Sequence, residues 1–155
     1  MTIGLNGPVD TRVDDSYRRL RIIWLAILAA VVAAFVVTRL TEANFIGGSP
    51  WLFWFFLAIG AANLAVSFYV KQQTLKKAVE AQNLGMAQSA YVVAFAICEA
   101  VALLGLVAHL SSGHKFYYFL FVLGGFGVVL HKPQRDDLQA AASGAGGVWE
   151  AKRQG

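Results

Sequence analysis

Charged residues are scarce in this 155-residue chain: Asp, Glu, Lys and Arg make up 14% of it, while 57% is hydrophobic. Soluble domains carry about 25% charged residues, so this chain has too few to cover a water-exposed surface. Its single cysteine, Cys98, cannot form an internal disulfide and has no second thiol at metal-ligand spacing. It has only three prolines, Pro8, Pro50 and Pro133, and none of them lies inside a long apolar run. The shortages indicate an all-α integral membrane protein.

Four apolar runs are long enough to be considered as membrane crossings, which need roughly 20 residues for about 30 Å of hydrocarbon. They predict a transmembrane domain over 20–131 built as an antiparallel four-helix bundle. The fourth run is the shortest, so we expect either that its flanks Lys115 and His131 snorkel toward the interface or that the bilayer thins around it. The predicted helices cover about 20–40, 50–70, 87–111 and 115–131.

The basic residues predict the orientation of the bundle. Four crossings put both termini and the 71–84 connection on one face, and eleven of the 13 Lys and Arg residues lie there. Only Arg39 and Lys115 lie opposite. By the positive-inside rule both termini are cytoplasmic, in a bacterial-type inner membrane.

The polar segments complete the predicted domain organisation. Residues 1–19 form a cytoplasmic N-terminal segment. The 71–84 connection contains good helix formers and no proline, so we expect it to continue the second helix, with a break near Gly85. Residues 132–155 are expected to be a mobile tail, because Pro133 stops helix propagation and no apolar period follows it.

One carboxylate interrupts the third run, AFAICEAVALLGLVAHL (94–110), at Glu99. An acid at the centre of a spanning helix costs about 2.5 to 3.5 kcal/mol on insertion scales, and such residues are usually functional. Asn63 in the second helix lies at a similar depth. If the two helices are antiparallel neighbours, its amide can hydrogen-bond the carboxyl, so we predict a proton-binding pair of Glu99 and Asn63. The alternative is that Asn63 only helps the helices to associate.

Small residues in the second and third helices predict close helix packing, because they let backbones approach without a hydrophobic driving force. They are spaced three and four residues apart in the second helix. The predicted packing residues are Ala58, Ala61, Ala62, Ala65, Ala96, Ala100 and Gly105.

The segment around Glu99 resembles the ion-binding helix of the proteolipid c subunit of rotary ATP synthases. The resemblance lies in Glu99, Ala100, Ala102 and in Gly105 with Leu106, and extends to the hairpin formed by the second and third helices. It implies that Glu99 binds the transported ion. The lack of a hydroxyl at Ala100 is similar to the proton-using version of that family.

The resulting expectation is a non-enzymatic membrane subunit that binds a proton at Glu99 within an energy-coupling complex. No nucleotide-binding, metal-binding or nucleophile motif occurs, so no cofactor or metal is expected. The expected partners are the lipid bilayer and other complex subunits or further copies of the chain, and no nucleic acid. Two alternatives are open: a structural accessory subunit of a respiratory or photosynthetic complex, and a small proton-coupled transporter.

Overall fold

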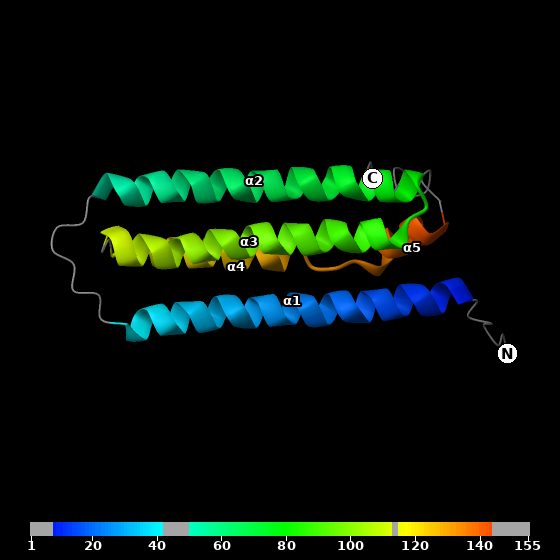
Figure 1. Ribbon diagram of the computed structural model, residues 1–155, viewed down its shortest axis with the longest axis horizontal. Helices are drawn as coiled ribbons and strands as arrows, with labels where there is room; N and C mark the ends of the chain where they lie inside the picture. The colour runs from blue at the N-terminus through cyan, green and yellow to red at the C-terminus, as the bar shows by residue number, and fades with distance from the viewer. Residues whose placement is uncertain (1–7, 42–49, 113–114, 144–155) are drawn as a thin grey trace.

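The computed structural model describes residues 8–41, 50–112 and 115–143, and in these ranges the chain is helical without any strand. The predicted all-α class is therefore confirmed. Figure 1 shows the long helices α1, α3 and α2 side by side, with the short helices α4 and α5 behind them. The helices are α1 (Pro8–Leu40), α2 (Pro50–Glu80), α3 (Leu84–Ser112), α4 (Tyr118–Leu130) and α5 (Arg135–Ser143).

Three of these helices, α1, α2 and α3, are long and apolar enough to cross a membrane. Helix α4 is apolar throughout but has only 13 residues, which gives a length of about 20 Å at 1.5 Å per residue. The structure thus supports a membrane protein with three candidate spans and a shorter fourth apolar helix.

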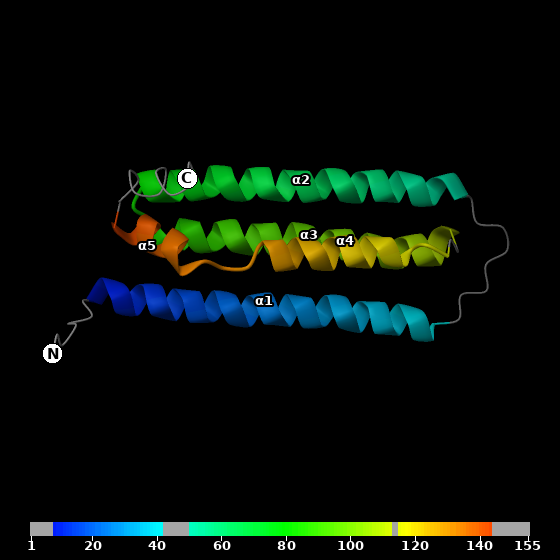
Figure 2. The same ribbon diagram turned by 180° about the vertical axis from the view of Figure 1, so that it is seen from behind.

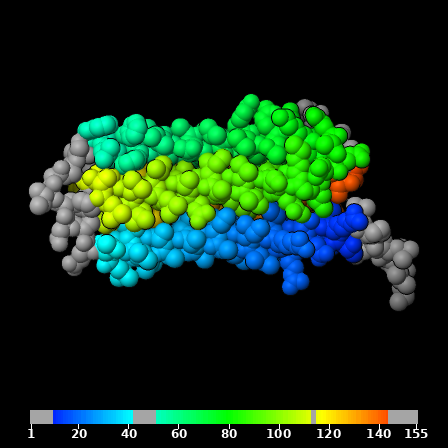
Figure 3. Space-filling view, in the orientation of Figure 1, coloured from blue at the N-terminus to red at the C-terminus, as the bar shows by residue number. Residues whose placement is uncertain are grey.

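Helix α3 is the centre of the bundle. It lies between α1 and α2, and α4 packs behind it, as the two opposite views show (Figures 1 and 2). Its buried positions are mostly small and recur every three or four residues, so one side of α3 can approach its neighbours closely. The small buried residues are Ala87, Ala90, Ala94, Cys98, Ala102, Gly105, Ala108 and Ser112. In the orientation of Figure 3 the opposite side of α3 is at the surface between α1 and α2.

The backbones of α3 and α4 approach closely at Gly124. A Cβ atom there would lie 2.6 Å from the backbone nitrogen of Ala102 and 2.7 Å from the carbonyl oxygen of Cys98. Backbone atoms cannot rotate away, so only glycine fits. Across the bundle, the Trp24 indole of α1 donates a 2.8 Å hydrogen bond to the Val128 carbonyl oxygen of α4.

Helix α5 corrects the prediction of a mobile tail for residues 132–143. Its residues Leu138 and Ala141 are fully buried in a hydrophobic cluster with parts of α1, α2 and α3. Asp136 and Asp137 lie in its first turn, where their negative charges interact favourably with the positive end of the helix dipole. The prediction was wrong because a nine-residue helix can bury one narrow apolar face without showing a long periodic pattern. Residues 144–155 of the predicted tail lie outside the described residues.

The N-terminal boundary also differs from the prediction. Helix α1 starts at Pro8, so the described part of the predicted 1–19 segment is continuous with the first long helix. Val13 and Leu20 are buried in the same cluster as Leu138. The first turns of α1 therefore help to build the end of the bundle that carries α5, which we call the α5 end.

The connection between α2 and α3 is helical up to Glu80, and a break follows at residues 81–83, close to Gly85; both features were predicted. Gln82 has a φ of 49°, the left-handed conformation that ends many helices. The Asn83 side chain then accepts a 3.0 Å hydrogen bond from the Met86 amide, which caps the start of α3. Local polar chemistry, rather than glycine, sets the turn.

Candidate functional site: a carboxylate on the outer side of the central helix

Glu99 lies near the middle of α3 and is partly exposed on the surface of the bundle. The preceding residue, Cys98, faces α2, with its sulfur 3.7 Å from the Ser67 hydroxyl oxygen. Each residue turns a helix by about 100°, so Glu99 points away from α2. Gln88, eleven residues or about three turns earlier, shares the face of Glu99 and hydrogen-bonds to Ser16 of α1. Glu99 therefore lies on the side of α3 nearer α1.

The surroundings of Glu99 are apolar. Ala96 and Ala100 on either side of it are exposed, and Leu103 one turn further is 45% exposed. Within residues 8–41, 50–112 and 115–143, no hydrogen bond or ion pair is made by the Glu99 carboxyl. Its carboxyl group is thus available at the surface of the central helix, at a depth where α1 and α2 contribute no charged residue.

Asn63 does not meet Glu99. Its side-chain nitrogen donates a 2.9 Å hydrogen bond to the Ile59 carbonyl oxygen of its own helix. The contact between α2 and α3 at this level is made by other residues, such as Ser67 with Cys98. Depth in the bundle could be estimated by counting residues, but the rotation of α3 about its axis could not, and that rotation separates the two predicted partners.

All but one of the predicted packing residues are exposed on the outside of the bundle rather than buried between its helices. Gly105 is buried, but against α4: a Cβ there would lie 2.7 Å from the Phe121 ring. The prediction that the alanines hold α2 against α3 is wrong, because they occupy the outer sides of both helices. The exposed residues are Ala58, Ala61, Ala62, Ala65, Ala96 and Ala100.

A buried polar cluster was not predicted. The Ser67 hydroxyl of α2 lies 3.3 Å from His131 Nε2 at the end of α4, and His131 Nδ1 lies 2.9 Å from the Gly127 carbonyl oxygen. Both Ser67 and His131 are fully buried. His131 therefore does not snorkel to an interface as expected. The available signal was the spacing of Asn63, Ser67 and Lys71, which puts three polar residues on one side of α2.

A second set of polar side chains connects α5 to the rest of the bundle. The Tyr91 hydroxyl of α3 donates a hydrogen bond to the Asp137 carboxylate and accepts a 3.1 Å hydrogen bond from the backbone N–H of Gln134. The Lys71 ammonium lies 4.2 Å from the centre of the Tyr91 ring. At the surface, Arg135 and Asp14 form a 2.8 Å ion pair. These groups all connect side chains of one chain, so we assign them a structural role.

Neither polar group forms a metal centre, because no three His, Cys, Asp or Glu side chains in the described part of the chain come close enough together to hold an ion. Comparisons with protein-family models, curated proteins and solved structures each return no match. Glu99 is the candidate site that combines a reactive side chain with access from outside the bundle.

Proposed function

We propose that this protein is a membrane subunit that binds a proton at Glu99 and presents that carboxyl to a neighbouring subunit of an energy-coupling complex. The observation that supports the proposal is the position of Glu99: mid-helix, partly exposed, and without a partner from the described part of its own chain. A carboxylate in hydrocarbon is costly, whereas the protonated acid is neutral and can exchange its proton with a partner group.

The proposal includes four crossings with both termini in the cytoplasm, so the α5 end lies on the cytoplasmic side. The uneven distribution of Lys and Arg supports this orientation. The depth of Glu99 follows from it, since 15 residues of α3 precede Glu99 and 13 follow it. At 1.5 Å per residue this is about 20 Å of helix on each side.

The resemblance of the Glu99 segment to the proteolipid c subunit is consistent with this role. The resemblance implies that Glu99 is the ion-binding residue. Ala96 and Ala100 would let a partner helix come close to the carboxyl, because small residues permit close backbone approach. The six exposed alanines thus become candidate contacts between chains.

Carbodiimide labelling of the intact protein in lipid vesicles tests the proton-binding role. The reagent attacks protonated carboxyls in apolar surroundings, so we expect selective modification of Glu99. Glu80, exposed at the end of α2, is the matched control carboxylate. Glu99→Gln should abolish the labelling and the infrared band of a protonated carboxyl, while Glu80→Gln should change neither. Equal labelling of both residues, or an unchanged band in Glu99→Gln, would refute proton binding.

A structural accessory subunit is the second candidate, because an acid on the outer side of a helix can also simply hydrogen-bond a neighbouring chain. The two roles respond differently to substitution. Glutamine keeps hydrogen bonding but cannot release a proton, so Glu99→Gln preserves assembly in an accessory subunit and stops proton-linked activity in a coupling subunit. Glu99→Leu should impair assembly in both cases.

A further inference from the structure

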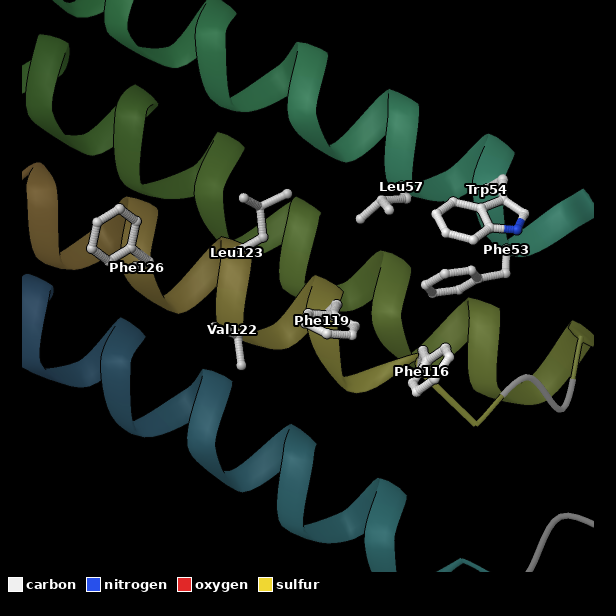
Figure 4. Close-up of a pocket in the computed structure, with 8 residues that line it drawn as sticks. All are labelled: Phe53, Trp54, Leu57, Phe116, Phe119, Val122, Leu123 and Phe126. Carbon is white, nitrogen blue, oxygen red and sulfur yellow. The ribbon is translucent and has the colours of Figure 1, made fainter.

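An apolar groove of about 440 Å³ lies between helices α2 and α4, and Figure 4 shows the side chains that line it. Its lining comes from the first turns of α2 and from α4 with the turn that precedes it. The lining side chains are Phe53, Trp54, Leu57, Phe116, Phe119, Val122, Leu123 and Phe126. The Trp54 indole nitrogen is the only polar side-chain atom among them.

The groove is open along the outside of the bundle. Phe53 at its base is fully buried, whereas Trp54, Phe119 and Phe126 on its edges are each about half exposed. In the proposed orientation it starts near the membrane surface opposite the α5 end and reaches toward the middle of the bilayer. Water is absent at that depth, so hydrocarbon must fill the hollow.

The groove also has a cation at its outer end. The Lys115 ammonium lies 5.1 Å from the centre of the Phe116 ring, and Phe116 lines the groove. Lys115 is exposed and therefore able to contact a headgroup. An anionic group at Lys115 and an alkyl chain along α4 are the two parts of an acidic phospholipid.

From these features we propose that the groove between α2 and α4 binds one acyl chain of an anionic phospholipid, whose phosphate contacts Lys115. A lipid chain fits the site better than a partner helix does. Helices associate in membranes through small residues, and this groove is lined by large ones, whereas the exposed alanines of α2 lie outside it. The volume is within the range of about 300 to 1,000 Å³ that is usual for small-molecule sites.

The test uses the full-length protein in vesicles that contain phosphatidylglycerol with a photoreactive diazirine in one acyl chain. Irradiation followed by peptide mass analysis should place most of the label on residues 53–57 and 116–126. Filling the groove with the double variant Leu57→Phe/Val122→Phe should remove this labelling. Val93→Phe, on the exposed side of α3 away from the groove, is the matched control and should leave it unchanged.

The Lys115→Gln variant tests the headgroup contact without altering the packed interior. We expect it to lower the preference for phosphatidylglycerol over phosphatidylcholine about fivefold, the change that corresponds to about 1 kcal/mol for one basic residue near an anionic surface. Label spread evenly over all exposed helix faces would overturn the proposal, because it would indicate bulk lipid only. Crosslinks from the groove to a second protein chain would overturn it as well. Neither result depends on Glu99, so the proposed function is tested separately.

Discussion

Gly124→Ala should separate α3 from α4 and destabilise the protein. The added Cβ would lie 2.6 Å from the Ala102 backbone nitrogen, whereas ordinary van der Waals contact begins near 3.4 Å, so the helices must move apart by about 0.8 Å. Overpacking of this kind costs about 1 to 3 kcal/mol. The higher helix propensity of alanine compared with glycine offsets about 1 kcal/mol of this loss of stability. We therefore expect the free energy of unfolding to fall by up to about 2 kcal/mol.

The neighbouring Gly125→Ala is the matched control. The nearest atom to its new Cβ is the Val31 Cγ1 at 3.8 Å, which is an ordinary contact. Gly125→Ala should therefore benefit from the higher helix propensity of alanine without a steric clash, and stabilise the protein by up to about 1 kcal/mol. Unfolding of the purified proteins in a mild detergent, followed by circular dichroism, measures the difference. If Gly124→Ala proved as stable as Gly125→Ala, the close α3–α4 contact would be disproved.

Two further pairs of substitutions test the α5 end. Leu138→Ala should release α5 from the bundle, since truncating a fully buried leucine costs about 2 to 5 kcal/mol of stability. The release should appear as faster amide hydrogen exchange over residues 135–143. Gln139→Ala, at a half-buried position, is the control and should change the exchange little. Gln82→Gly should stabilise the α2–α3 turn by about 0.5 to 1 kcal/mol because Gln82 has a positive φ, while Asn83→Ala should cost about 1 kcal/mol through loss of the cap. Equal unfolding midpoints for the Gln82 and Asn83 variants would contradict the turn geometry.

The long helices could be predicted from the sequence because their apolar runs are set by composition alone. The extension of α2 past Val70 was also predictable, since the residues up to Glu80 are good helix formers. Helix α5 was not predictable in the same way. Leu138 and Ala141 become an apolar face only when α1, α2 and α3 provide a surface to bury them, and that surface is a tertiary property.

The candidate site could likewise be predicted from the sequence only in part. Glu99 was identified by its chemistry, an acid in an apolar run, and the structure places it where another molecule can reach it. Its supposed partner Asn63 required knowledge of helix rotation, which the sequence does not contain. The alanines illustrate the same limit: their spacing predicts one common face, but not whether that face meets the same chain or another molecule.

The position of α5 in the chain has a consequence for biosynthesis. The cluster around Leu138 draws on the start of α1 and on α2 and α3, yet α5 is translated only after all four preceding helices. The residues of α1, α2 and α3 that pack against Leu138 therefore lack this cover until the ribosome has added α5. Completion of this cluster is therefore a late step of folding, because it cannot precede the synthesis of α5.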